Sequence, residues 1–194
     1  MINERIAESS LRDLEAGAFE ETATGIVLPR QKMVMGGVFS HEVIRAGRSM
    51  GLLHDHNKIV NEGLNDLLQT YLGNGTQIPT WYVGIFEGNY TPVAGDAAAS
   101  IATNSTESIA YDETTRPEWV DAAAAAQSIS NTASKAVFTI NATKTIYGAL
   151  LVSTNTKAGA AGKLFSASRF AVSRSVVTAD QLLISYTVQA SSTT

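Results

Sequence analysis

A helix that runs directly into an apolar strand, within residues 57–87, constrains the fold of this chain more than any other stretch. Its apolar residues recur at the spacing of one helix face: Val60, Leu64, Leu67, Leu68, Tyr71 and Leu72. This spacing predicts a short amphipathic helix over about residues 58–72. Asn57 or Asn61 is the expected N-cap, and Gly73 is expected to end the helix because glycine tolerates positive φ.

The strand expected over residues 80–86 is apolar on both faces, which is typical of a strand that is covered on both sides. Gly63 lies inside the helix, where it costs about 1 kcal/mol relative to alanine, so we expect another backbone to approach it closely. We interpret the helix and the strand as scaffold. Partner contacts are expected in the segment before them and in the loops after them.

Further apolar runs with alternating character recur about every ten residues, with turn residues between them. They cover residues 136–140, 145–152, 163–172 and 182–188. A hairpin is expected earlier, from Met33 onward with its turn at residues 46–48, and residues 97–102 form a candidate short helix. The pattern predicts a mainly β protein, with an antiparallel β-sandwich or jelly-roll-like domain over residues 36–190.

Residues 1–35 are expected to form an extended N-terminal arm outside this domain. Their apolar residues make a stripe too thin to anchor a helix on a core: Ile2, Ile6, Leu11 and Leu14. Two interpretations remain open, a frayed terminus or an arm that becomes ordered against a neighbouring subunit.

Composition excludes several classes of function. Charged residues make up 16% of the chain, against about 25% in a typical globular protein, and small polar residues and alanine replace them. A net charge of −4 with scattered basic residues argues against nucleic-acid binding. No apolar run approaches the ~20 residues of a membrane span, and the acidic, polar start does not resemble an export leader. Without cysteine there are no disulfides, thiolate metal sites or cysteine nucleophiles.

Histidines occur in two places that suggest a metal site. His41-Glu42 resembles the start of a zinc-protease motif, but that motif needs a second histidine where this chain has Arg45. His54 and His56 point to the same side of a strand, as two ligands would, and His41 is a candidate third ligand across the hairpin. Because further ligands are missing locally, we favour polar edge residues or caps over a metal site.

No catalytic constellation is visible in the sequence. Asp112, Glu113 and Asp121 are acidic, but nothing places a partner base beside them, so a solvated acidic loop is expected. Phosphate-binding, nucleophile-elbow and calcium-loop motifs are absent. We therefore expect no catalytic, cofactor-binding or metal-binding residues, and no enzyme.

The central segment carries a family resemblance. Residues 56–98 combine a His-Asn, Val-Asn-Glu-Gly-Leu start with a later Thr-Trp-Tyr-Val-Gly, and the segment resembles a recurrent virion protein of tailed bacteriophages. The resemblance extends over residues 36–188. Its other parts are Thr106-Glu107, Tyr111, Thr115-Arg116-Pro117, Asn131 to Lys135, Ile146-Tyr147-Gly148, Gly162 to Phe165 and Ser173-Arg174.

The resemblance implies a non-enzymatic capsid cement or decoration protein, which binds the outside of the shell and stabilises it. Its expected partners are the major capsid protein and copies of itself, as a homodimer or homotrimer, in virions assembled in the bacterial cytoplasm. A tail, collar or fibre-attachment component of the same virion is the first alternative. The second is a module that binds host glycans, with Trp81, Trp119 or Tyr111 as stacking platforms.

Overall fold

The computed structural model describes residues 19–21, 25, 27–29 and 32–193. The chain divides into two units, of which the larger is Gly36–Gln189 and the smaller comprises Met1–Met35 and Ala190–Thr194. Within the smaller unit, β1 (Phe19–Glu21) pairs antiparallel with β2 (Val27–Pro29). Most of the N-terminal arm expected over residues 1–35 lies outside the described residues.

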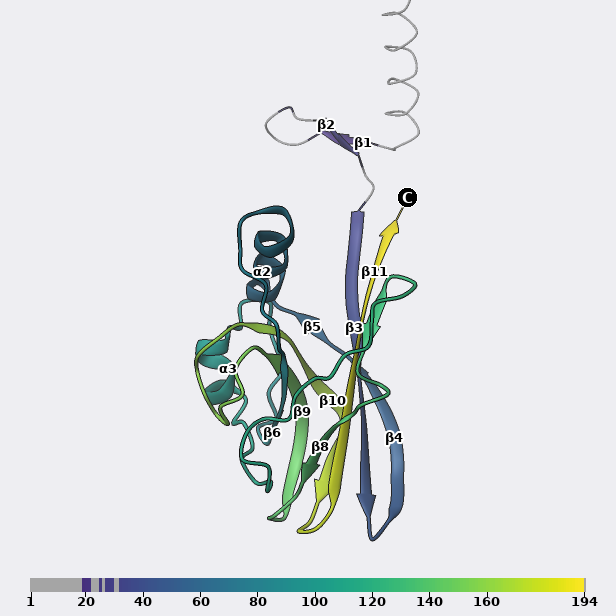
Figure 1. The fold of residues 1–194 in the computed structure, drawn as a ribbon, viewed down its shortest axis with the longest axis vertical. Helices are drawn as coiled ribbons and strands as arrows, with labels where there is room; N and C mark the ends of the chain where they lie inside the picture. Colours follow the sequence, from purple (N-terminus) through teal and green to yellow (C-terminus); the bar gives the residue numbers. More distant parts are fainter. Residues whose placement is uncertain (1–18, 22–24, 26, 30–31, 194) are drawn as a thin grey trace, which may run out of the picture. The chain divides into compact units, whose positions relative to one another are not determined.

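One of the two main sheets has the strand order β4-β3-β11-β7, and β8 also pairs with β11 (Figure 1). Its strands are β3 (Lys32–Arg45), β4 (Arg48–His56), β7 (Ser128–Ser130), β8 (Ala136–Thr139) and β11 (Gln181–Thr193). The β3–β4 hairpin turns at Ala46 and Gly47, both at positive φ, so that Arg45 pairs with Arg48 as the turn residues predict.

The second sheet has the order β5-β10-β9-β6 and is also antiparallel. Its strands are β5 (Lys58–Ile59), β6 (Tyr82–Phe86), β9 (Lys144–Val152) and β10 (Leu164–Val176). The two sheets form the β-sandwich expected from the sequence, which confirms the predicted fold class.

Two helices lie in the described residues, α2 (Asn61–Leu72) and α3 (Ala98–Asn104). The helix predicted from residue 58 begins only at Asn61, because Lys58 and Ile59 pair with β10 instead. Neither expected asparagine caps it: Val60 is the N-cap, and Asn57 donates a 2.7 Å hydrogen bond to the Tyr186 hydroxyl.

Gly73 ends α2 as expected but not for the expected reason. Its φ is −104°, so it does not use the left-handed region that favours glycine. Instead the chain folds back tightly, and a Cβ at Gly73 would lie 2.7 Å from Nε2 of Gln69. The glycine is needed for space, because both Gly73 N–H and Gly75 N–H donate to the Gln69 carbonyl.

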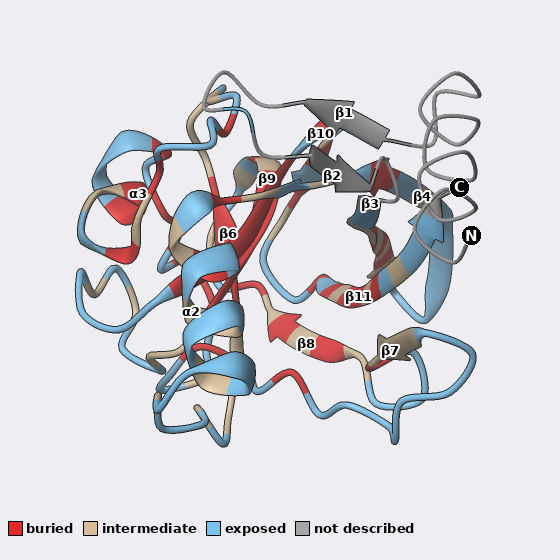
Figure 2. Cartoon of the chain, turned by 90° about the horizontal axis from the view of Figure 1, so that it is seen from above, coloured by how far each residue is buried: buried red, intermediate tan, exposed pale blue. Residues whose placement is uncertain are grey.

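The core lies on both faces of the second sheet. A cluster between this sheet and α3 consists of Val60, Phe86, Ala98, Ile101, Leu150, Val152, Leu164 and Ala167. Figure 2 shows buried residues along β6 and β9. The expectation that residues 80–86 are covered on both faces is confirmed, since Val83 to Phe86 are all buried.

Candidate interaction surface

Most of the apolar stripe predicted for α2 faces solvent, although Val60 is buried in the core and Leu67 is half-buried. Leu64, Leu68, Tyr71 and Leu72 are 37%, 49%, 85% and 77% exposed, and Gly63 is the one buried residue of the helix. Figure 2 shows α2 as a largely exposed helix beside a well-buried sheet. An apolar stripe exposed over successive helix turns is a candidate surface for contact with another molecule. We call these four residues the α2 stripe.

The helix is anchored through its opposite side. A Cβ at Gly63 would lie 2.6 Å from the carbonyl oxygen of Phe165, so the helix backbone touches β10 directly. The close approach expected from Gly63 is therefore confirmed. Next to it, the Glu62 carboxylate accepts hydrogen bonds from the backbone N–H groups of Ala98 and Leu164, at 2.8 and 2.7 Å. The negative charge of this carboxylate also interacts favourably with the positive N-terminal end of the α3 dipole.

This anchoring explains why most of the apolar side of α2 is exposed although the helix is fixed to the domain. An amphipathic pattern predicts that the apolar face is buried, but here a small residue and a carboxylate form the inward face. Gly63 gains the closest packing, and Glu62 satisfies two backbone donors that apolar side chains would leave unpaired. As a result Leu64, Leu68 and Leu72 are left exposed.

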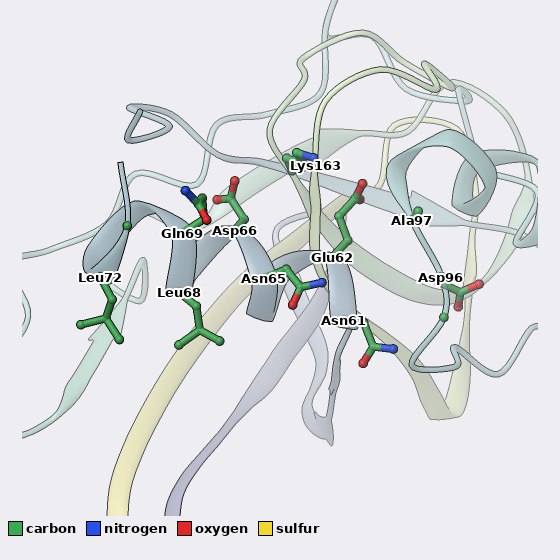
Figure 3. A pocket seen from close by; sticks show the side chains of 12 residues that line it. Asn61, Glu62, Asn65, Asp66, Leu68, Gln69, Leu72, Asp96, Ala97 and Lys163 are labelled. Atoms are coloured by element: carbon green, nitrogen blue, oxygen red, sulfur yellow. The ribbon is translucent and has the colours of Figure 1, made fainter. Parts of the chain in front are cut away.

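An open hollow of about 960 Å³ runs alongside the stripe. It is lined by Asn61, Glu62, Asn65, Asp66, Leu68, Gln69, Leu72, Gly73, Gly95, Asp96, Ala97 and Lys163. Figure 3 shows Leu68 and Leu72 projecting from the same side of α2 and Asp66 from the other. Asp96 is already engaged, accepting hydrogen bonds from the Tyr90 hydroxyl and the Val93 N–H. The lining of the hollow is mostly polar, and Leu68, Leu72 and Ala97 are its apolar side chains.

The histidines do not converge on one site. His54 and His56 lie opposite Ser40 and Val38 on the outer face of the hairpin, and Nδ1 of His54 is 2.8 Å from the Ser40 hydroxyl. His41 is on the inner face, fully buried, so it is not a third ligand for them. Among residues the structure describes, no group of three His, Asp or Glu side chains is placed to hold a metal ion.

His41 forms a buried contact between the two sheets instead. Its ring stacks on Phe170 of β10 with centroids 3.7 Å apart, and its Nε2 is 2.8 Å from Oδ2 of Asp55. Oδ1 of Asp55 accepts the Ala171 N–H at 2.7 Å, which extends the contact to β10. Burial holds the pKa of His41 below its usual 6.5, and Arg174 and His54 act in the same direction, while Asp55 opposes them.

This burial predicts a pH-dependent stability. His41 takes up a proton near pH 6.5 in the unfolded chain and only at lower pH in the folded chain. Its contribution to the free energy of unfolding is therefore fully present above pH 6.5 and is lost as the pH falls below it. We expect the free energy of unfolding to fall as the pH is lowered from 7.5 to 5.5. Urea denaturation at a series of pH values measures this free energy. His41→Gln should remove most of its dependence on pH. The exposed His54→Gln variant should keep the slope; if it removes the slope instead, the assignment to His41 is wrong.

The acidic loop is more structural than expected. The Glu113 carboxylate accepts the Thr139 N–H at 3.1 Å, and Asp112 accepts from the Asn141 side chain, while Asp121 is exposed. Sequence reasoning missed the carboxylate that matters most there. Glu107 is buried and forms a bidentate ion pair with the buried Arg116.

Two of the three proposed stacking platforms are covered. Trp119 is 7% exposed and its Nε1 donates a 3.0 Å hydrogen bond to the Tyr186 carbonyl. Tyr111 is 1% exposed, packs edge-on against Phe138 and carries the Lys157 ammonium 3.8 Å above its ring. Trp81 is partly buried and makes an edge contact with Phe165. Trp119 and Tyr111 therefore present no open ring face to a sugar.

Comparison with known proteins gives no family assignment. No protein-family model matches this chain, and no curated protein matches it. No helix in the described residues is both long and apolar enough to cross a membrane. The functional interpretation therefore depends on the sequence resemblance and on the geometry of the surface.

Proposed function

We propose that this chain is a non-enzymatic structural protein of a tailed-phage virion, which binds the outside of the capsid shell and stabilises it. The observation that carries the proposal is the α2 stripe, an exposed apolar surface on a helix whose sequence bears the most specific part of the phage-virion resemblance. The partner is the major capsid protein, with contacts to further copies of this chain around it.

The chemistry of the α2 stripe suits burial against a protein. The helix has no basic residue in its last turn, and the exposed stripe combines leucines with a tyrosine. Interface cores are depleted in charge and enriched in aromatic residues, so Tyr71, at 85% exposure, is a suitable anchor. A binding role of this kind requires no reacting group.

A tail, collar or fibre-attachment component of the same virion is the alternative. It would use the same surface, and copy number separates the two. Quantitative mass spectrometry of purified particles should find this chain in numbers comparable to the coat protein. About a dozen copies or fewer per particle, as in a single symmetric ring, would contradict the capsid role and support the tail component instead. The glycan-binding alternative loses support, because Trp119 and Tyr111 are buried.

A charge in the α2 stripe should weaken shell binding. We expect Leu68→Lys to weaken binding to shells that lack this protein by about tenfold or more, because a charge would be buried at the centre of the contact. Sedimentation of such shells with added protein measures the bound fraction. Leu68 is 49% exposed, so the fold should be little affected.

Ile109→Lys is the matched control, since Ile109 is 59% exposed and is not part of the α2 stripe but of the segment after α3. It should bind shells like the unmodified chain. Equal binding by Leu68→Lys and the unmodified chain would contradict the role of the α2 stripe.

A further inference from the structure

A second hollow, of about 260 Å³, collects positive charge in a protein whose net charge is −4. It is lined by His56, Asn57, Lys58, Thr91, Pro92, Ala167, Ser168 and Arg169. Three of these side chains are basic and none is a carboxylate. We call His56, Lys58 and Arg169 the cationic cluster.

Strand register brings the cationic cluster together. Lys58 of β5 pairs with Ala167 of β10, so Arg169, two residues further on, lies on the same face. His56 precedes Lys58 by two residues and shares that face, and its carbonyl accepts a 2.8 Å hydrogen bond from the Ser168 hydroxyl. Like charges at neighbouring positions across strands repel each other. The fold therefore holds Lys58 and Arg169 in a place where a bound anion would relieve their repulsion.

Part of the donor capacity in the hollow is not used by the described part of the chain. Arg169 donates its Nε to the Asn89 side-chain oxygen at 2.6 Å, which orients the guanidinium and leaves its two Nη groups without a protein acceptor in the described part of the chain. Neither Lys58 nor Arg169 forms an ion pair with any residue that the structure describes, in contrast to Lys135 and Lys144, which pair with Glu42 and Glu87.

We propose that the cationic cluster binds a tetrahedral oxyanion of the phosphate or sulfate class. Donors that converge from two strands suit an anion with several oxygen atoms and more than one charge, and charge-assisted hydrogen bonds are the strong ones. A planar carboxylate with a single charge would leave part of the cluster uncompensated. This site is separate from the α2 stripe and does not depend on the proposed capsid role.

Titration of the ¹⁵N-labelled full chain with inorganic phosphate at constant ionic strength tests the proposal by NMR. We expect saturable shifts of the Asn57, Ser168 and Arg169 amides. Lys58→Met or Arg169→Met should each weaken binding about tenfold, since a hydrogen bond to a charged group is typically worth that factor. Both side chains are exposed, so an unchanged spectrum away from the hollow confirms that each variant is folded.

Lys163→Met is the matched control, because Lys163 lines the hollow beside α2, where Glu62 and Asp66 are also present. It should leave phosphate binding unchanged. Sulfate should compete with phosphate, and acetate should bind much more weakly. The proposal is overturned if the shifts do not saturate, if Lys163→Met weakens binding as much as Lys58→Met, or if acetate binds as tightly as phosphate.

Discussion

Replacing Arg116 by methionine should lower the free energy of unfolding by about 3–5 kcal/mol, because it leaves the buried Glu107 carboxylate without its partner. In the folded chain, Nε and Nη2 of Arg116 donate to the two carboxylate oxygens of Glu107, at 2.7 and 2.5 Å. Both side chains are completely buried. A lone buried carboxylate would need to take up a proton or draw water into the fold.

Arg116 also holds a loop. Nη1 and Nη2 donate to the carbonyls of Thr154 and Gly159 at 2.9 and 3.1 Å, and the Arg116 N–H donates to Asn155. One side chain thus connects the 107–116 segment to the connection between β9 and β10. The sequence predicted that this connection is exposed, and most of its side chains are. Its carbonyl oxygens nevertheless accept hydrogen bonds from the buried guanidinium of Arg116.

Urea denaturation of Arg116→Met measures the predicted loss, with the exposed Arg48→Met as the control for removing a guanidinium. The double variant Glu107→Met/Arg116→Met should be more stable than Arg116→Met alone, because an apolar pair leaves no buried charge. It should not recover fully, since the carbonyls of Thr154 and Gly159 still lose their donor. A loss below about 1 kcal/mol in the single variant would contradict this account.

Gly148→Ala should be the next most damaging change, with a loss of about 3 kcal/mol, at the upper end of what an overpacked core normally shows. Gly148 pairs with Phe86 of β6 on one side and Arg169 of β10 on the other. A Cβ there would overlap the Phe86 ring and the carbonyl oxygen of Ser168. The ring can shift, but the backbone oxygen of a paired strand cannot do so without disturbing the sheet.

The rescue experiment separates the two clashes. Phe86→Leu combined with Gly148→Ala should recover part of the stability, because a smaller side chain frees space over position 148. Recovery should stay incomplete, since the Ser168 oxygen remains in place. Gly95→Ala is the control, because nothing lies within 4 Å of a Cβ built on Gly95. Thermal or urea unfolding measures the stability of all three variants, and a stable Gly148→Ala would show that β9 and β10 adjust more easily than the register implies.

The local pattern of the sequence was sufficient for most of the secondary structure. Strands 136–140, 145–152 and 182–188 appear as β8, β9 and part of β11, since a period of two is a property of the chain itself. The turn at Ala46 and Gly47 was likewise readable from Gly47, which accepts a positive φ without strain. Both faces of the strand at 82–86 are buried, as its continuous apolar run predicts.

Tertiary structure decided which faces are used. The sequence predicted the apolar stripe of α2 but not the direction in which it points. Gly63 packs against Phe165, and Glu62 accepts a hydrogen bond from the Leu164 N–H. These contacts join residues about a hundred positions apart in the chain, and they leave most of the stripe exposed. The same holds for Arg116 with Glu107, and for Lys58 beside Arg169. Such pairings depend on sheet register and loop closure, which no local period encodes. The sequence alone therefore determined a β-sandwich with one amphipathic helix, and only the fold determined that Leu64, Leu68 and Leu72 of this helix are exposed.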